Sequence, residues 1–250
     1  MSHRKPLFSA IGVLCLLISL AAGQSKQVTR QTQIWLRYYN QTKLSGQWTT
    51  HIELEEREFL SPSRVHARFL PRIQLISRIG AGWEGGVGLA YILQAQPQDP
   101  ARPVNVMVPE WRPHLALTYK QKTGSLGISH RYWLEERFVR NSTATGLRSG
   151  YQFTLRCRYR LQVEVPVLDG NNGLGSLKAR GFDEVFLNLG HNIIRNTFDQ
   201  NRIGASLVIG ISSKLAVEAG YFNWFQERSS GDQYYSRDIV RFTLHHSVAL

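Results

Sequence analysis

The sequence predicts an all-β protein, and within that class an antiparallel transmembrane β-barrel with a polar lumen rich in arginine and glutamate. Three observations predict this fold. Apolar and polar residues alternate along many segments, short turns mostly alternate with longer polar connections, and the polar positions carry arginine and glutamate in similar numbers. Barrels of the bacterial outer membrane show this pattern because one face of each strand meets lipid and the other faces a polar interior.

The N-terminal segment predicts export. MSHRKP is basic, LFSAIGVLCLLISL is apolar but too short to span a membrane and remain there, and AAG offers small residues for cleavage. We therefore expect a signal peptide at 1–23 and a barrel domain at 24–250; the alternative is a retained membrane anchor. Export to the outer membrane makes nucleic acid an unsuitable partner despite the formal net charge of +12. Cys157 would be the one cysteine left, so no intramolecular disulfide is expected.

Eleven segments have the period-two pattern of strands, and turn residues separate them in order along the chain. Segments 32–41 and 46–57 flank KLSG, 68–79 and 82–92 flank GAG, 110–119 and 125–138 flank KTGS, 148–167 and 182–191 flank a long polar stretch, 198–210 and 214–227 flank ISSK, and 236–250 is the last. The longer connections are expected at 58–67, 93–108, 168–181, 192–197 and 228–235.

The strand count does not match the usual parity. Single-chain bacterial barrels have an even number of strands. We therefore predict twelve strands, with a further one around 24–31, and ten as the alternative. Twelve strands would place the long connection 168–181 at the periplasmic end.

The segment YQFTLRCRYRLQVEVPV at 151–167 shows the alternation most clearly. Its odd positions are nearly all apolar, and its even positions include Arg156, Arg158, Arg160 and Glu164. A soluble β-sandwich also alternates, but with its apolar face inward. Paired arginine and glutamate favour a confined interior, because a guanidinium binds a carboxylate in bidentate fashion and keeps its charge.

The same reasoning gives a predicted charge network in the lumen. Its members are Glu53, Glu55, Arg57, Arg72, Glu110, Arg112, Arg131, Glu135, Arg137, Arg156, Arg158, Arg160, Glu164, Glu184, Arg202 and Glu218. Lysine is expected only in turns, loops or the N-terminal tail, at Lys26, Lys43, Lys120, Lys122, Lys178 and Lys214. Outward aromatic girdles are expected from Trp35, Tyr39, Trp48, Trp83, Tyr91, Trp111, Tyr119, Tyr151, Tyr221 and Phe225.

Several of these segments carry a resemblance to a known family. They are QIWLRYYNQTKLSGQW, PEWR at 109–112, HRYWLEERF at 130–138, RCRYRLQVEVP, DEVFLNLG at 183–190, FDQNR at 198–202 and VEAGYFNWFQ at 217–226. In order and spacing the chain resembles the domain of unknown function 2490 family of outer-membrane proteins. The resemblance implies an outer-membrane barrel and no particular reaction. Asp183 stands where the family pattern suggests asparagine, and Leu250 stands where outer-membrane strands usually end in an aromatic residue.

The charged lumen suggests a narrow channel or binding barrel for small anionic solutes, with outer-membrane lipid around it. The alternative is a structural or interaction barrel whose lumen is sealed by Arg–Glu salt bridges. A third hypothesis is a hydrolase, in which His245 and Ser247 share one side of a strand and Asn223 orients the histidine. No catalytic residue, cofactor or metal site is assigned from the sequence.

Overall fold

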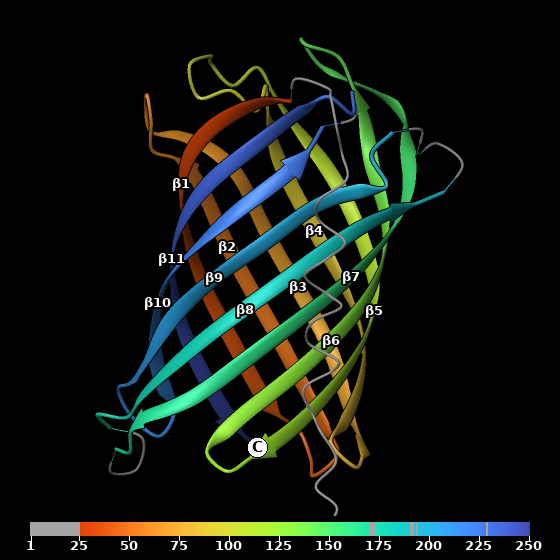
Figure 1. The fold of residues 1–250 in the computed structure, drawn as a ribbon. Helices are drawn as coiled ribbons and strands as arrows, with labels where there is room; N and C mark the ends of the chain where they lie inside the picture. The colour runs from red at the N-terminus through yellow and green to blue at the C-terminus, as the bar shows by residue number, and fades with distance from the viewer. Residues whose placement is uncertain (1–25, 171–173, 191–192, 194, 229) are drawn as a thin grey trace, which may run out of the picture.

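The described residues of the computed structural model are 26–170, 174–190, 193, 195–228 and 230–250, and their eleven strands close into one barrel (Figure 1). The predicted signal peptide at 1–23 lies outside these residues. The strands are β1 (Gln27–Lys43), β2 (Trp48–Phe59), β3 (Val65–Gly80), β4 (Trp83–Gln96), β5 (Val106–Thr123), β6 (Leu126–Ser142), β7 (Leu147–Leu168), β8 (Leu177–Leu189), β9 (Phe198–Gly210), β10 (Leu215–Glu227) and β11 (Gln233–Ala249). The described residues contain no helix that is long and apolar enough to cross a membrane.

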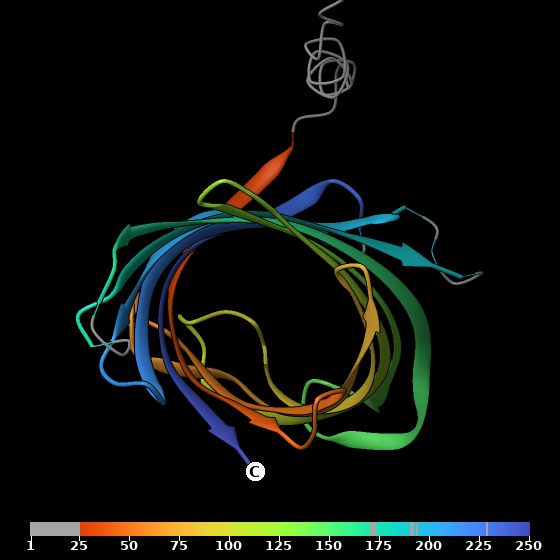
Figure 2. The ribbon, with the colours of Figure 1, turned by 90° about the horizontal axis from the view of Figure 1, so that it is seen from below.

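Each strand pairs with its sequence neighbour in antiparallel register, and the ring closes where β1 pairs with β11 (Figure 2). That closing pair is parallel, with Gln27 opposite Gln233 and Lys43 opposite Ala249. The prediction of twelve strands, antiparallel throughout, is therefore wrong for the described residues. The reason is that 27–31 lengthens the first strand instead of forming a separate one, which leaves eleven strands and a parallel seam.

The two ends of the barrel differ. The connections 44–47, 81–82, 124–125, 169–176 and 211–214 lie at the end where β11 finishes, and we call this the short-turn end. The connections 60–64, 97–105, 143–146, 190–197 and 228–232 lie at the other, the long-loop end. The long connection after β7 shares the short-turn end, as the sequence predicted for 168–181.

Five of the six lysines among the described residues lie at or near the short-turn end, and Lys26 precedes β1 at the other end. Lys43 is the last residue of β1, Lys120 and Lys122 lie among the last four residues of β5, and Lys178 is the second residue of β8. The expectation that all lysines lie in turns or loops is thus wrong for these four, although each lies within a few residues of a strand end.

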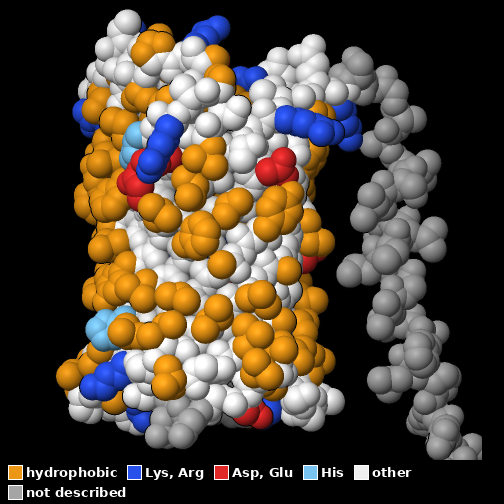
Figure 3. Space-filling model, turned by 90° about the vertical axis from the view of Figure 1, so that its left-hand side faces the viewer, with side chains coloured by type: hydrophobic (Ala, Val, Ile, Leu, Met, Phe, Trp, Pro, Cys, Tyr) orange, Lys and Arg blue, Asp and Glu red, His pale blue; other side chains and the backbone are white. Residues whose placement is uncertain are grey.

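Apolar side chains cover the outside of the barrel. Every strand contributes at least one exposed large hydrophobic residue, and Leu115 and Ile203 in the middle of their strands are 56% and 57% exposed. The face in Figure 3 is largely hydrophobic along its length, with charged side chains mostly toward the two ends. The alternation therefore places apolar residues outward, the reverse of a soluble sandwich.

Part of the interior is aromatic. Trp35 is 1% exposed and packs edge-on against Phe222 and Trp224, with ring centroids 5.0 and 5.7 Å away. Tyr39 lines an internal cavity. The prediction that Trp35 and Tyr39 belong to the outer girdle is wrong, because the inner face of β1 carries odd-numbered residues and Leu36 takes the outer face. Trp48, Trp111, Tyr151 and Tyr221 do lie exposed on the outside.

Gly204 makes room for this aromatic cluster. A Cβ atom at that position would lie 2.2 Å from Cβ of Phe222 and 2.3 Å from the carbonyl oxygen of Tyr221. We expect Gly204→Ala to force the β9–β10 backbones apart and to lower the free energy of unfolding by about 1–3 kcal/mol. Urea unfolding followed by tryptophan fluorescence would measure this. Gly46→Ala is the control because its Cβ would meet nothing within 4 Å, and an equal effect at both positions would contradict the packing argument.

Candidate functional site

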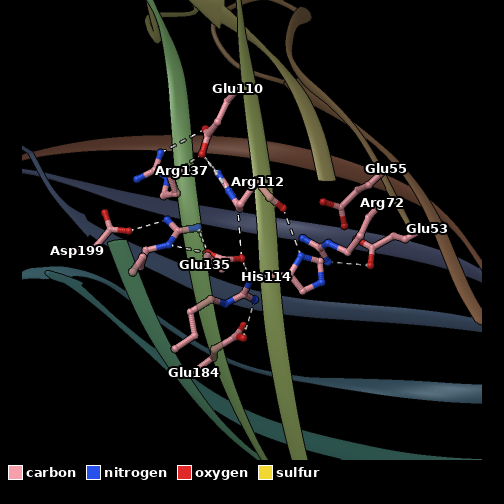
Figure 4. A network of polar contacts seen from close by, with 12 residues as sticks. Glu53, Glu55, Arg72, Glu110, Arg112, His114, Glu135, Arg137, Glu184 and Asp199 are labelled. Atoms are coloured by element: carbon pink, nitrogen blue, oxygen red, sulfur yellow. Dashed lines mark hydrogen bonds and ion pairs between the residues drawn. The ribbon is translucent and has the colours of Figure 1, made fainter. Parts of the chain in front are cut away.

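A network of ion pairs covers the inner wall formed by β5 to β9, and Glu135 is its centre (Figure 4). Glu135 on β6 is fully buried, and it lies opposite Arg156 of β7 in the register. Its Oε2 accepts hydrogen bonds from Nε and Nη2 of Arg156 at 2.8 and 2.5 Å. Its Oε1 accepts one from Nη1 of Arg158 at 2.6 Å and lies 3.9 Å from Nη1 of Arg112. One carboxylate therefore faces three guanidiniums.

Further carboxylates extend the network along the barrel axis in both directions. Glu110 accepts hydrogen bonds from Arg112 at 2.6 Å and from Arg137 at 2.7 Å. Glu184 accepts hydrogen bonds from Arg158 at 2.7 Å and Arg131 at 2.9 Å. Since the polar residues of adjacent strands point inward at matching heights, each carboxylate can reach arginines on two strands.

Asp199 on β9 completes this wall, because it accepts a hydrogen bond from Nη1 of Arg156 at 2.8 Å. Arg156 is thus held on both sides, by Glu135 and by Asp199, and is itself buried. Buried guanidinium–carboxylate pairs of this kind hold each other in fixed geometry.

Smaller groups of ions complete the inner surface. Arg72 donates to Glu53 at 3.1 Å, and Nε of Arg57 donates to Glu55 at 2.7 Å. Near the short-turn end, Glu218 accepts a hydrogen bond from Arg241 at 3.2 Å. Other pairs at that end join Arg180 to Glu218 at 3.0 Å, and Arg180 and Lys178 to Glu164 at 2.6 and 3.1 Å.

The sixteen residues selected from the sequence all lie on the inside of the barrel, where each is buried or lines an internal cavity. Sequence reasoning missed Arg37, Arg68, Arg237, Arg241 and Asp199, which also face the lumen. Arg237 and Arg241 share the odd positions of the last strand with His245, and that parity was the signal that could have found them. The lumen is therefore more cationic than the predicted near-balance of arginine and glutamate.

Three cavities lie in series along the lumen. The largest, of about 1100 Å³, lies toward the long loops and is lined by fifteen arginines but only six acidic residues. The second, of about 480 Å³, shares five lining residues with it, and the third, of about 530 Å³, lies at the short-turn end. The five shared residues stand where the first two cavities meet, and we call them the waist: Arg37, Glu53, Arg131, Arg160 and Arg241.

Several buried polar atoms inside the barrel have no hydrogen-bond partner among the described residues. They include Nη1 of Arg57, Nε of Arg202 and Nε2 of Gln200. A buried donor without a partner is costly, because it has lost its water and gained nothing in return. These guanidinium and amide N–H groups line a cavity rich in arginine. They can donate hydrogen bonds to an anionic ligand, but they cannot bind a metal ion.

The residues of the hydrolase hypothesis do not come together as predicted. His245 and Ser247 each line an internal cavity. Asn223 lies on the outer face of the barrel, where its Nδ2 donates a hydrogen bond to Oγ of Ser236 at 3.1 Å. The partner of His245 is Glu218, 2.7 Å from Nε2. The prediction that Asn223 orients His245 is therefore wrong, because odd positions of β10 face outward while odd positions of β11 face inward.

One comparison with known proteins gave a match. Residues 32–235 match the sequence model of a family described as a protein of unknown function, DUF2490. No curated protein and no solved structure matched the chain significantly. The match covers the chain from the first strand into the last.

Proposed function

The chain belongs to the DUF2490 family, which carries no assigned activity, and we propose that it is an outer-membrane β-barrel whose lumen binds or passes small anionic solutes. The observation that carries the proposal is the lining of the largest cavity, with fifteen arginines against six acidic residues. Lumens lined by an excess of one charge favour ions of the opposite charge.

The outer surface supports the membrane part of this proposal. Exposed leucine, isoleucine and valine on all sides of a closed barrel would be costly in water and are favourable in lipid. The short-turn end, with its lysines, would lie in the periplasm, and the long loops would face outward. Closure removes free strand edges, which a membrane does not tolerate. We expect the protein to remain with outer membranes on cell fractionation and to need detergent for release.

The series of three cavities supports a path for solutes. Consecutive cavities share lining residues, and the waist, where the first two meet, carries four arginines and one glutamate. At the waist Arg160 lies 3.9 Å from the Phe182 ring, and its Nη1 is 3.7 Å from Glu184. A passage lined by such an excess of positive charge would admit anions ahead of cations.

Conductance in planar bilayers tests the proposal. We expect discrete channels whose reversal potential in a potassium chloride gradient shows preference for chloride. Arg160→Gln removes one waist charge, so the ratio of anion to cation permeability should fall several-fold. Arg64→Gln is the matched control, because Arg64 lies in a loop and is exposed. Channels that prefer cations would contradict the proposal, and a silent bilayer would favour the barrel with a sealed lumen.

A further inference from the structure

The two walls of the largest cavity differ in how their arginines are compensated. On the β5–β8 wall, arginines contact carboxylates directly. On the wall formed by β9, β10, β11, β1 and β2, Arg202 makes no hydrogen bond or ion pair with any described residue, and Arg237 donates only to Gln31 and Gln226. Arg57 is paired with Glu55 alone.

Aromatic rings hold these three guanidiniums close together. Arg57 lies 3.5 Å from the centroid of the Trp35 ring, and Arg202 lies 5.3 Å from the same ring. Arg202 also lies 4.9 Å from Trp224, and Arg237 lies 4.4 Å from that ring. The order Arg57, Trp35, Arg202, Trp224, Arg237 forms a continuous row, which we call the arginine cradle. Ring faces attract a cation but do not neutralise its charge.

The cradle contains buried hydrogen-bond donors that no acceptor in the described part of the protein pairs with. Nη1 of Arg57 and Nε of Arg202 are buried and unpaired, and so is Nε2 of the neighbouring Gln200, whose Oε1 accepts from Trp224 at 2.7 Å. Arg57 is 5% exposed and Gln200 is 1% exposed. All of these side chains line the largest cavity, so a ligand in that cavity is close to them.

Charge decides the class of ligand. Three guanidiniums face one carboxylate, Glu55, so the cradle has a formal excess of two positive charges. The matching ligand carries two negative charges and several acceptor oxygens within a small volume. Phosphate meets this description, and guanidiniums bind it through paired hydrogen bonds.

We propose that the arginine cradle is a binding site for a phosphate dianion, either inorganic or as a monoester. This inference rests on the proposed function, because it assigns the ligand class of the same lumen. Phosphate oxygens would accept hydrogen bonds from Arg57, Arg202 and Gln200 and would neutralise the excess charge. The loop-side cavity would then concentrate phosphate compounds before they reach the waist.

Titration calorimetry on the purified, detergent-solubilised protein tests the site. The probes are inorganic phosphate, glycerol 3-phosphate and acetate at equal ionic strength and at about pH 8, where phosphate is mostly a dianion. We expect binding of one or both phosphates and none of acetate. Arg202→Gln should weaken phosphate binding by about tenfold or more. This variant is chosen because Arg202 pairs with no carboxylate, so its removal leaves no buried charge behind.

Arg228→Gln is the matched control, because Arg228 lines the same cavity but lies outside the cradle, where it donates to Gln233. It should bind phosphate as the parent protein does. Binding of both phosphates would show that the site admits esters, and binding of inorganic phosphate alone would restrict the site to the free ion. Absence of phosphate binding, or equal loss in Arg202→Gln and Arg228→Gln, would overturn the inference.

Bilayer recording separates this inference from the proposed function. We expect phosphate added on the long-loop side to reduce the chloride current, and Arg202→Gln to relieve that block. Chloride-selective channels without phosphate binding would leave the proposed function standing and remove the cradle. Phosphate binding by a protein that conducts nothing would support the cradle and restrict the function to binding.

Discussion

Replacing Glu135 by glutamine is expected to destabilise the barrel more than any other single change in the lumen. Glu135 is fully buried and faces Arg156, Arg158 and Arg112. The amide keeps the shape of the side chain but removes the charge that compensates these guanidiniums. Breaking one partner of a buried pair typically costs about 3–5 kcal/mol of unfolding free energy. Urea unfolding in detergent micelles, followed by tryptophan fluorescence, measures the change.

Two companion variants make this test specific. Glu58→Gln changes the same residue type outside the lumen, where Glu58 pairs with the exposed Arg64, and it should leave the unfolding midpoint unchanged. The double variant Glu135→Gln with Arg158→Gln removes a positive charge together with the negative one, so it should recover part of the lost stability. A Glu135→Gln protein as stable as Glu58→Gln would show that the network contributes little to folding.

Placing an arginine in the middle of the outer wall has the second large expected effect. Leu115 lies near the centre of β5, opposite Val87 on β4 and Leu134 on β6, and all three point outward. If this surface meets lipid, Leu115→Arg should lower the unfolding free energy in phospholipid vesicles by about 2–4 kcal/mol. Reversible urea unfolding from vesicles would measure it.

The position of the substitution provides the control. Ile79 is 64% exposed and is the second-last residue of β3, near the short-turn end. Ile79→Arg should cost only about 0–1 kcal/mol, because a guanidinium near the interface reaches water. Equal and small effects at Leu115 and Ile79 would mean that the outer wall does not lie in lipid.

The sequence was sufficient for the barrel and for most of its charged interior. Alternation predicted all eleven segments that form strands, because one face of each strand is strongly apolar while the other carries charges. The residues Glu135, Arg156 and Arg158 could be assigned to the same face of their strands from parity alone. Their mutual distances could not, since pairing across strands depends on register, and a slip of one residue would exchange the two faces.

The first strand shows where this reasoning fails. Gln33, Trp35 and Arg37 share the inner face of β1, so an aromatic residue sits among polar ones and the usual rule for outward aromatics does not apply. The indole nitrogen of Trp35 donates to Gln33 at 2.8 Å, which satisfies its polar group inside the barrel. Trp35 is inside because it packs on Phe222 above Gly204, a contact between residues far apart in sequence.

The arginine cradle could not be predicted from the sequence either, because its members lie far apart along the chain. Its members come from β1, β2, β9, β10 and β11. The parallel seam places Gln31 of β1 opposite Arg237 of β11, and Trp224 of β10 lies opposite the same Arg237. Parity arguments assumed that an even strand count governs closure, so this juxtaposition could not be derived. Arg202 was identified as lumenal, but its lack of a carboxylate partner appears only in three dimensions.

Because the number of strands is odd, β1 and β11 run in the same direction. In a barrel of consecutive hairpins with an even number of strands, the first and last strands run in opposite directions. Eleven strands carry the chain from one end of the barrel to the other, so Gln27 lies at the long-loop end and Ala249 lies at the short-turn end. Ten of the strands can be grouped into five antiparallel hairpins of consecutive strands, and the eleventh then pairs with β1 in parallel. If the barrel spans a membrane, reporter groups attached beside residues 26 and 250 should be accessible to a membrane-impermeant reagent from opposite sides of that membrane.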